Sequence, residues 1–140
     1  VVSRLAQFVD GHSVLMQAKH DGYKTRFGGC FHTRKILLSD RCLTVTDSLE
    51  GAFKSAKSRF FIHPELGVSI KDDTLLIIGS DFVMSSKLIG KSVSISDSFW
   101  HPEFGISIPN KVLEIEFESS EVEVIFTWSI RCHAYAFLDR

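Results

Sequence analysis

The sequence predicts an all-β protein, an antiparallel β-sandwich of two sheets with few or no helices. Apolar and polar residues alternate with a period of two over most of the chain, as expected for strands buried on one side. No segment of a dozen residues carries the apolar period of a helix. The chain also contains 12 phenylalanines, and aromatic rings fit the pleated surface of a sheet.

The length predicts a single domain, residues 1–140, large enough to build its own hydrophobic core. No linker rich in proline, glycine or serine divides the chain. The sequence opens in the middle of the alternating pattern, with Val-Val-Ser-Arg-Leu. We therefore expect it to be a fragment of a longer protein.

The alternation places the strands, and residues that favour turns separate them at the spacing of hairpins. The clearest predicted hairpin joins 113–117 to 122–130 across Ser119-Ser120, with an apolar face toward the core. Glutamates from Glu114 to Glu123 are expected on its solvated face. The remaining predicted strands are 14–20, 31–38, 43–49, 59–62, 75–78, 82–85, 93–99 and 132–137.

A ten-residue phrase occurs twice, and each copy predicts a strand, a sharp corner and a second strand. Proline does not occur inside a central strand, because it fixes φ and lacks an N–H. Glycine three residues later favours the positive φ that completes the reversal. The two copies are 61–70, FIHPELGVSI, and 99–108, FWHPEFGISI.

The two corners also carry two histidines and two glutamates, His63, Glu65, His101 and Glu103, which are residue types that bind zinc. A repeat in sequence does not by itself bring its copies together in space. We therefore interpret the repeat as two similar strand corners and expect no metal site and no cofactor.

The charge of the chain argues against several classes of function. A formal net charge of −1 provides no excess of Lys and Arg for a nucleic-acid surface. The densest basic stretch, Lys54, Lys57 and Arg59, is interpreted as a solvated face. No apolar run reaches the length of a membrane span. Neither a phosphate-binding glycine loop nor a nucleophile elbow is present, which excludes nucleotide enzymes and serine hydrolases of these types.

Several motifs, in this order and spacing, resemble the C-terminal β-sandwich of heparinase II/III-like polysaccharide lyases. Each motif alone is unspecific, and the resemblance rests on their combination from about Arg4 to Trp128. The motifs are 20–23 (HDGY), 32–34 (HTR), 43–51 (LTVTDSLEG), 59–64 (RFFIHP), 95–105 (ISDSFWHPEFG) and 109–115, with its proline and VLEI.

The resemblance implies a parent enzyme in which an α/α toroid precedes the sandwich and an acidic polysaccharide lies in the cleft between them. Enzymes of this family cleave uronic-acid glycosidic bonds by β-elimination, a form of general acid–base catalysis. Their catalytic Tyr and its partners lie on the toroid or in earlier strands. We therefore expect this chain to support the toroid and form one wall of the cleft, with no catalytic or metal-binding residue of its own.

Five residues are the candidates for substrate contact, and most have a second interpretation. Tyr23 also suits a half-buried residue whose hydroxyl caps a strand end. Arg34 also suits a cross-strand ion pair with Asp47. For Phe99-Trp100, core packing is favoured over stacking on a sugar ring. The candidates are Tyr23, Arg26, His32, Arg34 and Trp100.

Two other functions remain open, a free-standing carbohydrate-binding or adhesion module and a purely structural domain of the cell envelope. The expected partners are an acidic polysaccharide, through the parent enzyme, and the toroid. An exposed sheet edge would also allow a homodimer. The resemblance favours the periplasm or cell envelope, whereas three cysteines without a disulfide pattern favour the cytoplasm.

Overall fold

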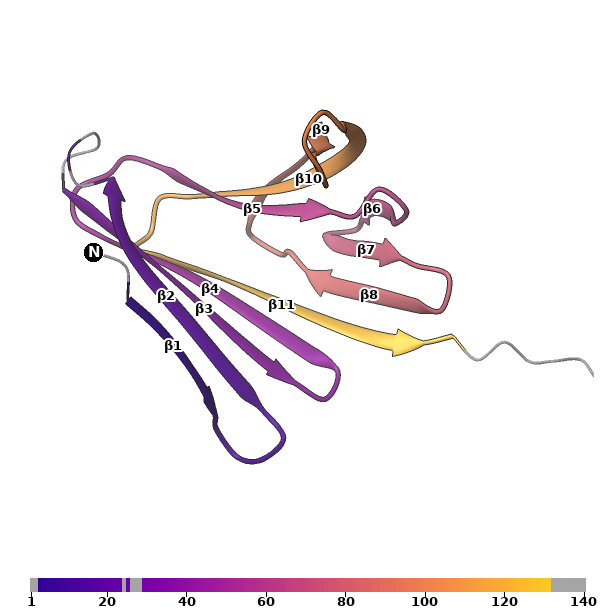
Figure 1. The fold of residues 1–140 in the computed structure, drawn as a ribbon, viewed down its shortest axis with the longest axis horizontal. Helices are drawn as coiled ribbons and strands as arrows, with labels where there is room; N and C mark the ends of the chain where they lie inside the picture. Colours follow the sequence, from indigo (N-terminus) through magenta and orange to yellow (C-terminus); the bar gives the residue numbers. More distant parts are fainter. Residues whose placement is uncertain (1–2, 24, 26–28, 132–140) are drawn as a thin grey trace, which may run out of the picture.

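A computed structural model describes residues 3–23, 25 and 29–131, and these residues form eleven strands in two antiparallel sheets (Figure 1). No helix occurs among them, so this part of the chain contains no helix able to cross a membrane. The prediction of an all-β protein with two antiparallel sheets is confirmed. The strand expected at 132–137 lies outside the described residues.

The larger sheet has eight strands in the order β1-β2-β3-β4-β11-β8-β7-β6, and the smaller sheet has the order β5-β10-β9. The strands of the large sheet are β1 (Ser3–Phe8), β2 (Val14–Tyr23), β3 (Cys30–Ser39), β4 (Cys42–Glu50), β11 (Glu121–Ile130), β8 (Phe82–Lys87), β7 (Thr74–Ile78) and β6 (Gly67–Lys71). Those of the small sheet are β5 (Ala56–Ile62), β10 (Ile108–Phe117) and β9 (Ser92–Trp100).

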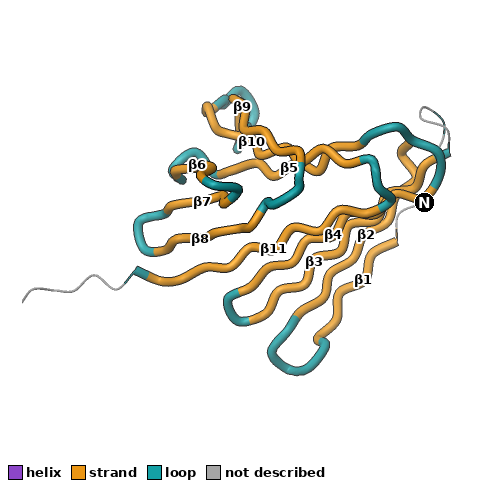
Figure 2. The backbone as a smooth tube through the Cα atoms, turned by 180° about the vertical axis from the view of Figure 1, so that it is seen from behind, coloured by secondary structure: helices purple, strands orange, loops and turns teal. Residues whose placement is uncertain are grey.

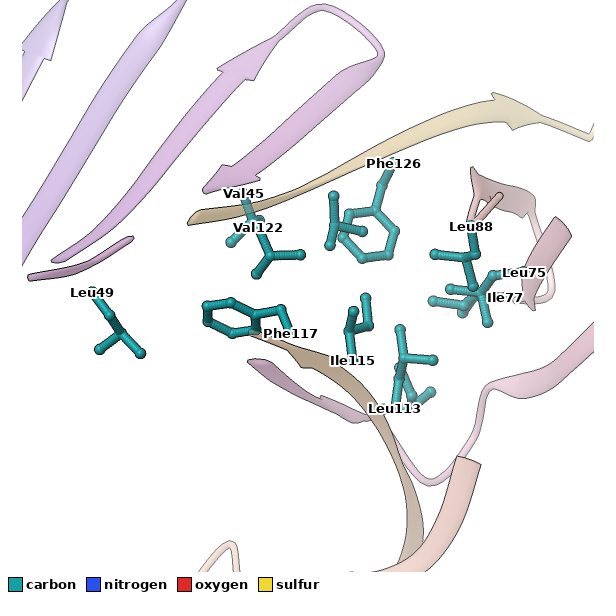
Figure 3. Packing of buried hydrophobic residues seen from close by; sticks show 12 residues of the cluster. Val45, Leu49, Leu75, Ile77, Leu88, Leu113, Ile115, Phe117, Val122 and Phe126 are labelled. Carbon is teal, nitrogen blue, oxygen red and sulfur yellow. The ribbon is translucent and has the colours of Figure 1, made fainter. Parts of the chain in front are cut away.

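The hydrophobic core lies between the small sheet and the middle of the large one. Alternate residues of β10 point into it and meet side chains from β4, β11 and β7 and from Leu88, which follows β8, as Figure 3 shows. The small sheet does not reach β1 and β2, which extend beyond it (Figures 1 and 2). As a result, Phe8 on β1 is 79% exposed and Met16 on β2 is 42% exposed. The most deeply buried core side chains are Leu75, Leu113, Ile115 and Val124.

The predicted hairpin between 113–117 and 122–130 is wrong, although both of its strands exist. β10 pairs with β5 and β9, whereas β11 pairs with β4 and β8. The turn at Ser119-Ser120 therefore carries the chain from one sheet to the other. The alternating pattern could not reveal which strands pair. Two strands can bury their apolar faces equally well as neighbours in one sheet or as facing strands of two sheets.

The two copies of the repeated phrase do come together in space. β5 and β9 are both antiparallel to β10, so they run in the same direction and their corners lie at the same end of the small sheet. The first corner passes the chain to β6 in the large sheet, and the second returns it along β10. Gly105 in the second corner has the expected positive φ of 80°, whereas Gly67 is already the first residue of β6.

We expect the substitution Ile115→Ala to lower the free energy of unfolding by about 2–5 kcal/mol, because it opens a cavity in a fully buried site. Ile115 has an exposed fraction of 0%. The same substitution at Ile125, which is 45% exposed on β11, should cost less than about 1 kcal/mol. Urea unfolding followed by circular dichroism measures both values. Equal costs would contradict the core described above.

Candidate functional site

A cavity of about 640 Å³ lies beside β3, β4 and the start of β5, at the end of the sandwich away from the two corners. Its volume is within the range of small-molecule sites in proteins. Its lining combines apolar residues with four cationic ones. The lining residues are Tyr23, Cys30, His32, Arg34, Asp47, Leu49, Phe53, Lys54, Ser55, Ala56, Lys57, Arg59 and Phe117.

A buried carboxylate, Asp47, organises the polar side of the cavity. It lies directly opposite Arg34 in the β3–β4 register and is 2% exposed. Arg34 donates from Nε to Oδ1 and from Nη2 to Oδ2, both at 2.7 Å. Such a bidentate pair fixes the plane of the guanidinium as well as its position. The cross-strand ion pair expected for these two residues is therefore present.

Asp47 also connects the two sheets. Ser58 on β5, which is 3% exposed, donates from its hydroxyl to Asp47 Oδ2 and accepts a hydrogen bond from Arg34 Nη2 at 3.2 Å. The Arg34 guanidinium also lies over the ring of Phe60, 5.3 Å from its centroid. The carboxylate on the large sheet thus fixes both a neighbouring strand and the edge strand of the facing sheet.

Two histidines extend this network toward the surface. Gly22 N donates to His20 Nδ1 at 3.2 Å, and His20 Nε2 lies 2.9 Å from His32 Nδ1. His32 Nε2 is in turn 2.8 Å from Asp47 Oδ1. Because Gly22 N–H is a donor, the whole chain of bonds is satisfied when each ring carries its proton on Nε2. Tyr23, whose ring is 5.2 Å from that of His20, lies at the outer end.

The environment of Asp47 lowers its pKa. Burial alone raises the pKa of this carboxyl, but the hydrogen bonds from Arg34, His32 and Ser58 and the positive charge of Arg34 outweigh that effect. The net result is a pKa well below the usual range of an aspartate. Asp47 is therefore ionised at neutral pH, and Arg34 is neutralised by it.

The cations of the cavity wall belong mainly to the segment 54–59. Lys57 and Arg59 both donate to Glu114 on β10, from Nζ at 3.1 Å to Oε2 and from Nε to Oε1. The hydrogen bond from Arg59 and, to a smaller extent, the one from Lys57 lower the pKa of Glu114. The Lys54 ammonium forms no ion pair or hydrogen bond with the described residues. Lys57 and Arg59 share the Glu114 carboxylate, and Lys54 has no partner among the described residues. This wall of the cavity is therefore positively charged.

The structure brings together three of the five predicted contact residues. Tyr23, His32 and Arg34 line the cavity, whereas Trp100 lies at the far end of the small sheet, where the two corners meet. Arg26 lies outside the described residues. Phe99 and Trp100 are 57% and 39% exposed, so the interpretation that favoured core packing is wrong.

Sequence reasoning missed several residues of the cavity, among them Ser58, His20 and the three cations of segment 54–59. The basic stretch was visible in the sequence, but its interpretation as a solvated face overlooked that β5 is an edge strand beside a cavity. No signal in the sequence placed Ser58 against Asp47. Among the residues that the structure describes, no group of three or more His, Cys, Asp or Glu is placed to hold a metal ion.

The family model described as "Heparinase II/III-like, C-terminal" matches residues 2–130, nearly the whole chain. This chain therefore belongs to the heparinase II/III-like family and corresponds to its C-terminal domain, as the motifs predicted. No curated protein matches it.

Solved structures show the same fold at low sequence identity. A protein described as "Heparinase III-BT4657 gene product" has a TM-score of 0.68 and 16% identity over 93% of this chain. The heparan sulfate lyase HepC from Pedobacter heparinus has a TM-score of 0.70 and 8% identity over 92% of it. In both comparisons this chain spans only 21% of the other protein. At these identities the likeness is one of fold.

The substitution Asp47→Asn is expected to lower the free energy of unfolding by about 2–3 kcal/mol at pH 7, because charged hydrogen bonds are lost around a buried site. The pKa of Asp47 is depressed in the folded state, so its contribution is present above the unfolded value of about 3.9. The difference between wild type and variant should shrink as the pH falls below about 4.

Urea unfolding at several pH values between about 2.5 and 7 measures this difference, because that range includes the unfolded pKa of an aspartate. Asp97→Asn is the matched control, because the Asp97 side chain is 87% exposed and pairs with Lys111 at the surface. It should cost less than about 1 kcal/mol at any pH. A pH-independent cost at Asp47 would show that its charge does not stabilise the fold.

Proposed function

We propose that this chain is the C-terminal β-sandwich of a polysaccharide lyase, whose parent enzyme cleaves uronic-acid-containing glycans by β-elimination. The observation that carries the proposal is the family match over residues 2–130. In this proposal the sandwich supports an α/α toroid outside this chain and forms one wall of the substrate cleft. The toroid supplies the base that removes the C5 proton and the acid that protonates the leaving glycosidic oxygen.

The charge of the cavity supports an acidic glycan as the molecule that this wall meets. Lys54 is unpaired among the described residues, and Lys57 and Arg59 place two positive charges on one Glu114 carboxylate. Arg34 Nη1 forms no hydrogen bond with the described residues, although Nε and Nη2 are held by Asp47. Carboxylate or sulfate groups of a glycan are suitable acceptors for these N–H donors.

The hydrogen bonds of the network argue against catalysis by this wall alone. A general base needs a lone pair within reach of the proton it removes. His20 Nδ1 and His32 Nδ1 already accept hydrogen bonds, and Asp47 accepts from three side chains. We infer that the network positions Arg34 and the strands of the wall, while proton abstraction takes place on the toroid side of the cleft.

The long relatives favour this proposal over a free-standing carbohydrate-binding module. The two solved proteins named above are described as a heparinase III and a heparan sulfate lyase, and each is more than four times the length of this chain, since 93% or 92% of this chain covers 21% of each. A sandwich that works beside a toroid fits that length. Because acidic glycans are mostly extracellular, we place the parent enzyme in the periplasm or cell envelope.

We expect Lys54→Ala to weaken the binding of an acidic oligosaccharide by about two- to five-fold, the effect of one exposed charge. Lys35→Ala is the control, because it removes an equal charge from the opposite face of the large sheet, one residue after Arg34. Isothermal titration calorimetry with heparan sulfate and alginate oligosaccharides measures both. The effect should decrease as salt is added. Absence of binding, or equal losses for the two variants, contradicts the proposal.

We also expect no lyase turnover by this chain alone. β-Elimination leaves a double bond conjugated to the uronate carboxylate, so product formation is followed by ultraviolet absorbance. Incubation with heparan sulfate or alginate should produce no increase above a buffer blank. A steady increase that depends on the concentration of this chain would place a complete reaction centre inside these residues and refute the division of roles proposed above.

A further inference from the structure

The cationic wall of the cavity continues onto the outer face of the small sheet. Side chains of β5 alternate between its two faces, so Ser58, Phe60 and Ile62 point toward the core. Lys57, Arg59 and Phe61 point outward. Lys57 and Arg59 also line the cavity, because β5 is the edge strand next to it. The first two residues of this outward row therefore belong to both surfaces.

The outward row ends in an exposed aromatic surface where the two corners meet. Phe61 is 64% exposed and lies opposite Val112 on β10. Trp100, paired with Ile108, points from β9 to the same outer face and is 39% exposed. The rings of His63 and Trp100 lie 5.0 Å apart, so the first corner contacts the end of the strand that leads into the second. Phe61, His63 and Trp100 are called the corner platform below.

A polar group at the corner platform lacks a partner. Asn110 is on β10, on the same face as Trp100, and is 8% exposed. Its Nδ2 donates to Ile62 O at 3.0 Å, but its Oδ1 accepts no hydrogen bond from the described residues. Buried acceptors in proteins are normally paired. Because Asn110 Oδ1 is itself shielded from solvent, it offers no contact to a ligand, and only the exposed rings of the corner platform can meet one.

The arrangement of charges favours an acidic ligand along the edge strand. Glu114 is the carboxylate partner of Lys57 and Arg59, and its side chain is only 16% exposed. The two cations are 43% and 54% exposed and lie outside it. Glu116, which is exposed and opposite Lys57, makes the β10 side of this face acidic. On this face the two cations therefore lie on the edge strand β5 and the two carboxylates on β10, so the positive side of the surface is its edge.

We propose that an acidic glycan extends from the cavity along the outer face of β5 to a second subsite at the corner platform. Its carboxylate or sulfate groups meet Lys57 and Arg59, and the apolar faces of separate sugar rings pack on Phe61 and on Trp100. This inference rests on the proposed function, because it assumes that the cavity binds an acidic glycan. The corner platform is then a binding site outside the cleft, and it holds the distal part of a long glycan substrate.

The test is the dependence of affinity on oligosaccharide length, measured by calorimetry with heparan sulfate oligosaccharides of increasing length. Wild type should bind longer oligosaccharides more tightly, since only they reach from the cavity to the corner platform. Phe61→Ala and Trp100→Ala should each lower the affinity for the longer oligosaccharides by about three- to ten-fold. Both should leave the affinity for the shortest bound oligosaccharide unchanged.

Phe99→Ala is the matched control, because Phe99 is 57% exposed but points to the opposite face of β9 from Trp100. It should leave the length dependence unchanged. Phe61 makes no ring contact with the described residues, so Phe61→Ala tests the subsite even if Trp100→Ala disturbs the corner. Thermal unfolding of each variant establishes that it is folded.

The result has three informative outcomes. Loss of the length dependence in the Phe61 and Trp100 variants alone supports the second subsite. Binding that depends on Lys54 but is indifferent to Phe61 and Trp100, or equally sensitive to Phe99, overturns the second subsite and leaves the proposed function standing. If wild type binds no oligosaccharide of any length, both proposals fail.

Discussion

The buried carboxylate of Asp47 is the constraint on which the site depends. An ionised group in a protein interior is tolerated only when its oxygens are well paired. Asp47 meets this condition with donors from β3, at His32 and Arg34, and from β5, at Ser58. Satisfying one charge therefore fixes the distance between the two sheets at this end, and the cavity wall takes its shape from that distance.

The residue that fixes the geometry of the cavity wall differs from the residues that give the wall its positive charge. Arg34 is neutralised by Asp47, so its contribution is a guanidinium held in a defined plane. The positive charge comes instead from the segment that precedes and begins β5, where Lys54 has no described partner and Lys57 and Arg59 share Glu114. Such a surface suits recognition of an anionic chain, the role proposed for it above.

The sequence determined which residues are buried better than it determined which strands pair. Alternation correctly placed Leu113 and Ile115 in the core and the Arg34–Asp47 pair across two strands, because both depend on local register. It failed at the 113–130 hairpin, because burial is the same for paired and facing strands. Contacts made across the sandwich, such as Ser58 with Asp47 or His63 with Trp100, depend on how the sheets are stacked, which no local pattern records.

The central claim is that the cavity beside Asp47 is the part of this domain that meets an acidic glycan. Titration of the isotope-labelled chain with a heparan sulfate or alginate oligosaccharide, followed by two-dimensional NMR, tests it most directly. The account predicts saturable shift changes at Tyr23, Lys54 and Lys57, around the cavity. Changes confined to surfaces remote from this wall, such as the β1 edge or the glutamates of β11, would contradict it.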